Sequence, residues 1–336
     1  MKISVVIPVY NDEEWVEGSI ESVLAQDYPD LECIVVNDRG EDRSMDIVRR
    51  MKAGHPRREA IRIAEHAKNL GLAAVRNTGI ETAKGEYIFF LDADDKLQDP
   101  SVISAMAAAT EKYDPDFVQG NYLRVSPKST VAALYYNPAH PLYRGAEIAD
   151  NFTRLNFTNA TNKLIRKEFL IDNHIFFTNG IIYEDALWSL LVYSNVRSVA
   201  TIPEITYMHN LREGSIMRSP ADEHKIDSLA FITDTTCRLP KRDDNMSQQI
   251  VQNAVYAMKL LFTEDFPREY RLSKVQEILG TGVGRLKFRR AALPPFSKRL
   301  SYALSMPPYL SYLYCRALGN MYASWKMKKE QADVQS

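Results

Sequence analysis

The segment Gly85-Glu86-Tyr87-Ile88-Phe89-Phe90-Leu91-Asp92-Ala93-Asp94-Asp95 is the most informative part of this sequence. It begins with a short apolar run, which is typical of a strand covered on both faces of a sheet. Three carboxylates follow at the carboxyl end of that strand, where open α/β sheets bind ligands. Asp92 and Asp94 flank a small residue, so both can turn toward one divalent cation such as Mg²⁺ or Mn²⁺. The competing interpretation is an acidic turn that only ends the strand and precedes a helix near Asp99-Pro100.

Strand and helix patterns alternate through the first 120 residues. Apolar, β-branched runs predict strands, and apolar residues at helical spacing predict the helices between them. The expected strands are residues 3–9, 31–36, 60–64, 87–91 and 117–119, and the expected helices are residues 15–24, 46–51, 72–83 and 101–112. This alternation predicts a Rossmann-like α/β fold, in which a mostly parallel sheet carries helices on both faces.

The pattern changes twice further along the chain. Between residues 121 and 220 it loosens into a loop at 135–142 and helices at 148–155, 167–171 and 184–193. Beyond residue 220 it is mainly helical, and the clearest helices are 224–236 and 247–262. We therefore expect an α/β domain over residues 1–220, with halves of residues 1–120 and 121–220, followed by a helical region over residues 221–336.

The composition is that of an ordinary soluble globular protein, because 45% of the 336 residues are hydrophobic and 25% are charged. Three cysteines lie far apart without metal-ligand spacing, which predicts reduced thiols in a cytoplasmic protein: Cys33, Cys237 and Cys315. Met1-Lys2 leads directly into an expected strand, so we expect no signal peptide. The nearest candidate for a membrane span, residues 302–318, is interrupted by Pro307-Pro308 and carries Arg316.

The charge is distributed unevenly along the chain. Residues 285–329 contain ten Lys or Arg and no Asp or Glu, whereas the rest of the chain has 32 basic and 43 acidic residues. Aromatic residues are interleaved with these cations, and together they predict peripheral contact with an anionic membrane. Two alternatives are a nucleic acid, for which no RNA-binding signature accompanies the patch, and packing of this basic region on the acidic body. We expect no nucleic-acid partner.

Polar residues follow the other expected strands as well. Tyr10, in Pro8-Val9-Tyr10-Asn11, can stack its ring on a flat base. Asp38 can accept hydrogen bonds from a ribose hydroxyl or a base N–H. Arg76 lies one turn into a helix, where it can pair with a phosphate or with the carboxylates of Asp38 and Asp92. Taken singly, these features have ordinary alternatives: a strand-to-helix turn for Tyr10, which is favoured when that turn is considered alone, a helix N-cap for Asp38 and a surface arginine for Arg76.

In their order and spacing, these clusters resemble glycosyltransferase family 2, whose members are nucleotide-sugar-dependent enzymes with the GT-A fold. The resemblance is strong over residues 3–120 and weaker to about residue 220. The residues that carry it are Ser4-Val5-Val6-Ile7-Pro8-Val9-Tyr10-Asn11, Ile34-Val35-Val36-Asn37-Asp38, Asn69-Leu70-Gly71 with Arg76-Asn77-Thr78-Gly79, and Gly85-Glu86-Tyr87 with Leu91-Asp92-Ala93-Asp94-Asp95.

The resemblance implies a donor site and a divalent metal, Mg²⁺ or Mn²⁺, that holds the diphosphate. Pro8 and Tyr10 would belong to the donor-binding set, with Tyr10 facing the base and Asp38 the base or ribose. Arg76 would lie at the nucleotide end and Asp92 near the sugar, and Asp94 would bind the metal together with Asp92. The role of Asp95 is left open.

One departure from the family pattern concerns the second strand. Relatives usually read Asp-Asp-Gly-Ser after it, whereas this chain has Asn37-Asp38-Arg39-Gly40. The glycine is displaced by one position and a cation is added, so the nucleotide that is held is left open.

The second half of the α/β domain supplies a candidate base. Glu184 and Asp185 fall at an expected helix start, where the macrodipole favours carboxylates, so ordinary first-turn acids are the alternative. The resemblance implies that Asp185 deprotonates the acceptor hydroxyl and that Glu184 orients Asp185 or the acceptor. It also places Arg212 near the diphosphate, with His209 as its rival, and Lys163 before the acceptor site.

These expectations combine into an inverting, metal-dependent glycosyltransferase. Its donor would be a nucleotide sugar, expected to be a UDP-sugar, and its acceptor a hydroxyl of a saccharide or lipid-linked saccharide. We expect a role in cell-surface polysaccharide synthesis at the cytoplasmic face of the cell membrane. A nucleotidyltransferase is the first alternative, but residues 8–12 lack its Gly-rich basic loop. A non-catalytic nucleotide-sugar or membrane-binding module is the second, and it would have no need of the retained acids.

Overall fold

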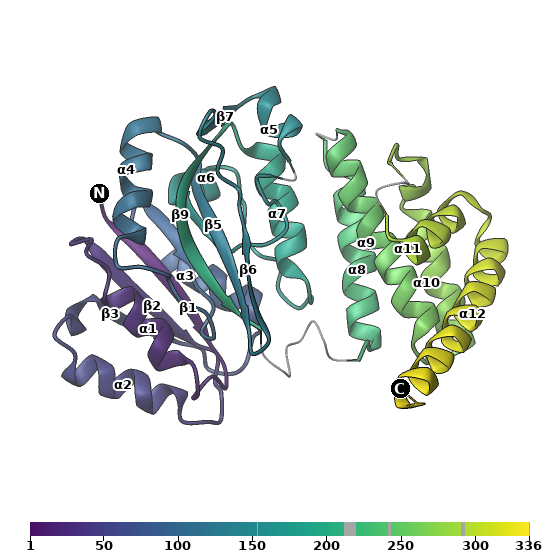
Figure 1. Cartoon of the computed structure of the whole chain (residues 1–336), viewed down its shortest axis with the longest axis horizontal. Helices are drawn as coiled ribbons and strands as arrows, with labels where there is room; N and C mark the ends of the chain where they lie inside the picture. Colours follow the sequence, from purple (N-terminus) through teal and green to yellow (C-terminus); the bar gives the residue numbers. More distant parts are fainter. Residues whose placement is uncertain (153, 212–219, 241–242, 290–292, 336) are drawn as a thin grey trace. The chain divides into compact units, whose positions relative to one another are not determined.

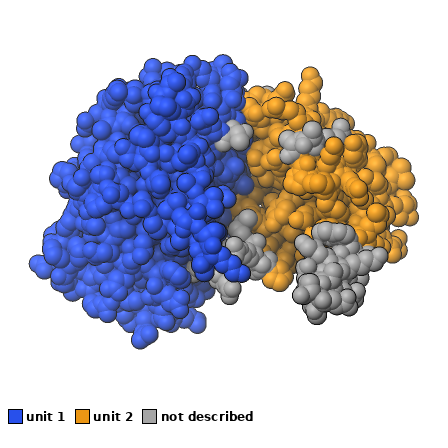
Figure 2. Space-filling model, in the orientation of Figure 1, with its two compact units in different colours: residues 1–180, 184–216 blue, residues 181–183, 217–336 orange. Residues whose placement is uncertain are grey.

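The computed structural model describes residues 1–152, 154–211, 220–240, 243–289 and 293–335 of the chain (Figure 1). The chain divides into two compact units, one of residues 1–180 and 184–216 and the other of residues 181–183 and 217–336 (Figure 2). The first unit contains the sheet, and the second is built from helices. The expected domain boundary at residue 220 and the division of the first domain into two halves stay predictions.

The first unit is built around one mixed sheet with the strand order β3-β2-β1-β4-β8-β5-β9-β7, and β6 pairs with β5. The strands β1 to β4 run parallel to one another, and β5 and β9 run parallel to each other. The strand β8 lies between β4 and β5 and is antiparallel to both. The strands are β1 (Ile3–Val9), β2 (Leu31–Asn37), β3 (Ile61–Glu65), β4 (Tyr87–Phe90), β5 (Phe117–Ser126), β6 (Ser129–Ala133), β7 (Leu142–Arg144), β8 (Lys163–Arg166) and β9 (Ser198–Asn210).

Helices cover both faces of this sheet. On one face, α1 (Val16–Leu24), α2 (Ser44–Gly54) and α4 (Val102–Tyr113) share a buried core with alternate residues of β1, β2 and β4. On the other face, α3 (Leu72–Thr82) lies so close to β1 that a Cβ atom on Gly79 would be 2.3 Å from the Val6 Cγ1 atom. The helix α7 (Glu184–Asn195) packs on this second face through Trp188, whose ring centroid is 6.1 Å from that of Phe90. Two shorter helices complete the unit, α5 (Ala146–Asp150) and α6 (Lys167–Asp172).

The expected fold class is confirmed, although the second half of the sheet contains more strands than the sequence pattern predicts. The strand β9 is 13 residues long and was missed because Pro203 interrupts an otherwise strand-like segment. The helix expected over 148–155 is wrong in extent, since α5 ends at Asp150. The Asn151 side chain there donates to the Glu147 carbonyl at 2.9 Å, an interaction that competes with helix continuation.

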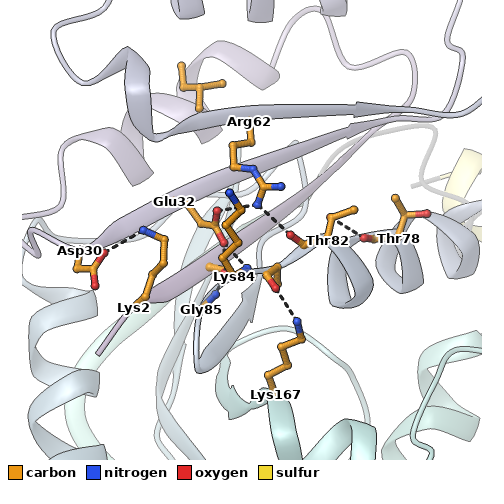
Figure 3. Close-up of polar contacts among 12 residues, drawn as sticks. Lys2, Asp30, Glu32, Arg62, Thr78, Thr82, Lys84, Gly85 and Lys167 are labelled. Carbon is orange, nitrogen blue, oxygen red and sulfur yellow. Dashed lines mark hydrogen bonds and ion pairs between the residues drawn. The ribbon is translucent and has the colours of Figure 1, made fainter.

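A buried carboxylate organises the edge of the sheet where β1, β2 and β4 begin (Figure 3). Glu32 accepts hydrogen bonds from the Ser4 hydroxyl at 2.6 Å, the Lys84 N–H at 2.6 Å and the Arg62 guanidinium at 2.7 Å. Burial raises the pKa of Glu32, but the combined effect of these three donors is larger and lowers it. The pKa of Glu32 therefore lies below its ordinary value. Gly85 must be small here, because a Cβ atom on it would lie 2.6 Å from the Ser4 hydroxyl oxygen. The polar residues at this amino edge are thus used to hold the sheet together.

The second unit is a bundle of helices. Asp222 caps α8 by accepting from the Lys225 N–H, and Asp243 caps α9 by accepting from the Met246 N–H, both at 2.9 Å. A Cβ atom on Gly319 would lie 2.3 Å from the Phe262 carbonyl oxygen, so the glycine lets α12 approach α9 closely. The elements are α8 (Glu223–Cys237), α9 (Asp244–Thr263), α10 (Arg268–Gly280), η3 (Val283–Arg285), α11 (Pro295–Leu300), η5 (Ser301–Ser305) and α12 (Pro308–Gln335). Among the described residues, none of the helices combines the length and the apolar character needed to cross a membrane.

Candidate active site

The carboxyl ends of β1, β2 and β4 bring the predicted donor residues to one edge of the sheet. The register pairs Pro8 of β1 with Val36 of β2, so Tyr10 and Asp38 follow at neighbouring positions. The Leu91 N–H donates to the Val6 carbonyl at 3.0 Å, which carries the chain from β4 into Asp92 beside β1. Since β8 is antiparallel to β4, its first residue also lies at this edge.

The turn after β1 presents Tyr10 to solvent. Tyr10 is 47% exposed, while its N–H donates to the Asp12 carboxylate at 3.0 Å. A Cβ atom on Gly40 would be 2.7 Å from the Asn11 backbone nitrogen, so the turn after β2 packs directly on the turn after β1. Arg39 occupies the place of the family glycine with a φ of 61°, a conformation that glycine adopts without strain. Gly40, the displaced glycine, is therefore needed because the two turns approach too closely for a side chain.

Asp38 is buried and holds the loop that leads into α3. It accepts hydrogen bonds from the His66 ring at 2.7 Å, the Leu70 N–H at 2.9 Å and the Gly71 N–H at 2.8 Å. An ionised carboxylate offers about four acceptor positions, so three are occupied and about one is left for a ligand. The structure thus gives Asp38 a structural task that the sequence did not indicate.

Arg76 is the buried centre of the site. Its Nη2 atom donates to Asp92 at 3.0 Å and its Nη1 atom to Glu184 at 2.8 Å, which joins α3, the turn after β4 and α7. Its side chain is 3% exposed, and its guanidinium carbon lies 5.3 Å from the Phe177 ring centroid. Burial lowers the pKa of Arg76, but the carboxylates of Asp92, Glu184 and Asp185 more than offset this, and the net shift is upward. The sequence predicted that Arg76 pairs with a phosphate or with Asp38 and Asp92. In the structure its carboxylate partners are Asp92 and Glu184.

The next residue of α3 fixes the segment that precedes α7. The Asn77 side chain donates to the Phe177 carbonyl and accepts from the Phe177 N–H, both at 2.8 Å. The Phe177 ring stacks on Trp188 with a centroid separation of 4.9 Å. The start of α7, which carries Glu184 and Asp185, is thereby anchored to α3. This function of Asn77 was missed, although the Arg76-Asn77-Thr78-Gly79 motif contained the signal.

Asp185 is half-buried beside this ionic cluster. Burial is the main cause that raises the pKa of Asp185 to about 7, and the negative charges of Glu184 and Asp92 add to it. Arg76 and the Ala186 N–H act in the opposite direction without cancelling the shift. A carboxylate whose pKa lies near neutral pH is suited to accept a proton in catalysis.

The last two acids of the turn after β4 have different surroundings. Asp95 is 1% exposed and accepts from the Tyr207 hydroxyl at 2.7 Å and the Asn210 N–H at 2.8 Å, and it pairs with His209 Nδ1 at 3.0 Å. These contacts tie the turn to the end of β9, so Asp95, the third acid of the turn, has a structural role. Burial lowers the pKa of His209, but Asp95 offsets this and the net shift is upward. Asp94 is partly exposed, and its carbonyl accepts from the Asn210 side chain at 2.6 Å.

The partly exposed carboxylates of Asp92 and Asp94 are compatible with a metal that arrives with a diphosphate. Mg²⁺ is commonly held by one or two protein carboxylates and completed by phosphate and water, and oxygen ligands also suit Mn²⁺. Within the described ranges, no group of three or more His, Cys, Asp or Glu could hold a metal alone. The residues therefore fit a metal shared with a ligand.

Two further residues were predicted for the site. Arg212 falls outside the described residues. Lys163, the first residue of β8, is 1% exposed and donates to the Asn159 carbonyl at 2.9 Å. Burial lowers the pKa of Lys163 to about 7, and Asp185 opposes this shift. Lys163 therefore holds the loop before β8 and is not available to solvent.

Comparison with known proteins identifies the family. The family model described as glycosyl transferase family 2 matches residues 4–173. The chain belongs to this family. This family 2 glycosyltransferase is 29% identical over 229 residues to the glycosyltransferase GlyG of Streptococcus pneumoniae serotype 4, covering 66% of this chain and 74% of that protein. It is 28% identical over 222 residues to the poly(ribitol-phosphate) beta-glucosyltransferase of Bacillus spizizenii, covering 65% of this chain but only 33% of that protein.

Solved structures agree with the fold of this family 2 glycosyltransferase. Residues 1–349 of S. aureus TarS in complex with UDP-GlcNAc superpose with a TM-score of 0.75 at 18% identity, covering 96% of this chain and 92% of that chain. The mannosyltransferase PcManGT from Pyrobaculum calidifontis, in complex with GDP-Man and Mn²⁺, has a TM-score of 0.53 at 16% identity, covering 97% of this chain and 87% of that chain. At these identities the likeness shows the shared GT-A-like fold.

Proposed function

We propose that this glycosyltransferase inverts the anomeric centre while moving a sugar from a UDP-sugar to a hydroxyl group. The observation that carries the proposal is Asp185, a carboxylate of raised pKa, held next to the Arg76 cluster at the carboxyl edge of the sheet. The donor class is supported by TarS, whose structure was determined with UDP-GlcNAc. The arrangement suits a reaction with a donor on one side of Asp92 and an acceptor on the other.

The donor half of the site is proposed to bind the nucleotide through the turns after β1 and β2. The exposed Tyr10 ring would stack on the base next to Pro8, and the remaining acceptor position of Asp38 would receive a base or ribose donor. Asp94, together with Asp92, would hold the divalent metal, and Arg212 would lie near the diphosphate. When bound, Mg²⁺ or Mn²⁺ supplies positive charge that neutralises the leaving diphosphate.

In the proposed reaction, Asp185 takes the proton of the acceptor hydroxyl. The acceptor oxygen forms a bond to the anomeric carbon on the face opposite the nucleotide, and the bond from that carbon to the diphosphate oxygen breaks. UDP leaves with the bonding electrons, and attack on the face opposite the leaving group inverts the anomeric configuration. Glu184 contributes by positioning, because its carboxylate is held by Arg76 and stays 10% exposed. By binding both Asp92 and Glu184, Arg76 would keep the donor side of the site at a constant distance from Asp185.

We propose a saccharide or lipid-linked saccharide as the acceptor and cell-surface polysaccharide synthesis as the process. Support comes from relatives named poly(ribitol-phosphate) transferases in Bacillus spizizenii and Staphylococcus aureus. The proposed location is the cytoplasmic face of the cell membrane, reached through peripheral contact of the basic residues 285–329 with anionic lipid.

A panel of nucleotide sugars tests this function. The wild-type chain is incubated with UDP-GlcNAc, UDP-glucose, UDP-galactose or GDP-mannose and Mn²⁺, with and without saccharide acceptors, and the released nucleoside diphosphate is measured. We expect UDP release from one of the UDP-sugars and a higher rate with the acceptor present. Thermal shift with each donor serves as the binding control. The absence of both turnover and a thermal shift with every donor would contradict the proposal.

A further inference from the structure

The helix α12 carries an apolar stripe on its exposed side. Its residues Ser311, Tyr312, Cys315 and Leu318 are buried within the second unit. The opposite side is exposed and follows helical spacing, with 56% exposure at Tyr309, 54% at Leu310, 41% at Leu313 and 59% at Met321. Ala317, also exposed, closes the gap between Leu313 and Met321. Single exposed apolar residues are normal, but a continuous stripe on one helix indicates a binding surface.

Exposed cations lie beside this stripe. The Tyr314 hydroxyl of α12 donates to the Arg299 carbonyl of α11 at 3.1 Å, and the Phe296 and Tyr322 rings lie 4.6 Å apart. The helix α11 therefore runs next to α12 and brings the exposed Lys298 and Arg299 to its side. Arg316 adds an exposed cation within the stripe itself.

These cations are not neutralised by carboxylates within the described part of the second unit. The ion pairs found there involve Arg238, which follows α8, and Arg271 and Lys274 of α10. None of them involves Lys298, Arg299 or Arg316, and residues 285–329 contain no Asp or Glu. The positive charge beside the stripe is thus available to an anionic partner.

We infer that the exposed stripe of α12, defined as Tyr309, Leu310, Leu313, Ala317 and Met321, inserts into the headgroup region of an anionic bilayer. An amphipathic helix lies in the membrane plane when its apolar face is buried among acyl chains and its flanking cations meet anionic headgroups. Charge complementarity favours the bilayer over a second copy of this chain, because two copies would bring the same cations together. This inference gives the proposed membrane contact a defined surface, and its test needs no donor or acceptor.

Vesicle flotation with the full chain tests this surface. Vesicles of phosphatidylcholine alone are compared with vesicles in which part of it is replaced by phosphatidylglycerol. We expect the wild type to float with the anionic vesicles and Leu310→Asp/Leu313→Asp to lose at least about tenfold in binding. Lys298→Glu/Arg299→Glu should lose binding as well, and added salt should weaken wild-type binding. The matched control is Leu134→Asp in the first unit, since Leu134 is 68% exposed and lies outside the stripe.

Unchanged flotation of Leu310→Asp/Leu313→Asp, or failure of the wild type to float, would overturn the inference. Light scattering tests whether a second copy of the chain covers the stripe instead. A wild-type dimer that dissociates in Leu310→Asp/Leu313→Asp, together with no binding to vesicles, would also overturn the inference. The milder Leu310→Ser/Leu313→Ser and a melting curve check that lost binding does not reflect lost folding. Nucleotide-sugar turnover in the same variants should stay at the wild-type level without vesicles.

Discussion

Replacing Asp185 by Asn is expected to lower the turnover of glycosyl transfer by about 10²- to 10⁴-fold, the usual effect of removing a general base. The amide has nearly the shape of the carboxylate but cannot take the proton of the acceptor hydroxyl. Donor affinity is expected to change little, because the contacts proposed for the nucleotide come from the turns after β1, β2 and β4. Initial rates of UDP release at saturating acceptor measure the loss, and titration with UDP measures the affinity.

The same substitution is expected to stabilise the fold above pH 7. The folded chain releases the Asp185 proton near pH 7, whereas the unfolded chain releases it near the ordinary value of 3.8. Between these values the folded state binds more protons, so stability falls as the pH rises. The neutral amide avoids this loss, and Asp185→Asn should gain on the order of 1 kcal/mol above pH 7 and nothing below about pH 4. Melting curves at several pH values measure the gain.

The wild-type rate should itself rise with pH through about 7, as the base becomes ionised. Asp46→Asn is the matched control, because Asp46 is also a first-turn helix acid and its side chain is 76% exposed. It should change neither the rate nor the pH dependence of melting. Near-wild-type turnover of Asp185→Asn would assign the base to another residue.

Replacing Arg76 by Met is expected to destabilise the first unit by about 3–5 kcal/mol, because breaking a buried ion pair leaves a carboxylate without its partner. Glu184, whose side chain is 10% exposed, would bear most of this effect, and the Phe177 ring would lose its cationic neighbour. Turnover should fall by about 10²-fold even where the variant stays folded, since α7 and Asp185 lose their anchor. Denaturant unfolding and UDP-release rates measure the two effects.

Arg50→Met provides the control for this prediction. Arg50 pairs with Glu17 at 3.2 Å on the surface, where both side chains are more than half exposed, so its loss should cost less than about 1 kcal/mol. Arg76→Lys should recover part of the stability but not the two simultaneous bonds. Equal stability of Arg76→Met and Arg50→Met would show that the buried cluster does not hold the site together.

The local parts of the fold were predictable from the sequence, and the long-range parts were not. The strands β1 to β4 are apolar runs between turns, and such runs are sufficient to predict a parallel sheet. The strand β8 is only four residues long and begins with a lysine, and β9 contains a proline, so neither shows a strand pattern. Their places in the sheet depend on pairing with β4 and β5, which no local pattern encodes.

The candidate site shows the same limit. Residue types after each strand were enough to predict an acidic edge, and the structure brings Tyr10, Asp38 and Asp92 to that edge. The partners of these residues were not predictable, because Arg76 meets Glu184 across 108 positions and Asp95 meets Tyr207 across 112. Burial separates the acids further, since Asp95 is enclosed by β9 while Asp94 remains partly exposed.

The affinity for UDP with and without Mn²⁺, measured by calorimetry in the wild type and in Asp94→Asn, tests the central claim most directly. The account predicts that Mn²⁺ strengthens UDP binding to the wild type. In the presence of Mn²⁺, Asp94→Asn should bind UDP at least about tenfold more weakly than the wild type, as expected when a carboxylate ligand is removed from a shared metal. Asp46→Asn should bind as the wild type does. Equal, Mn²⁺-independent affinities in the wild type and in Asp94→Asn would contradict a metal-diphosphate site at the end of β4.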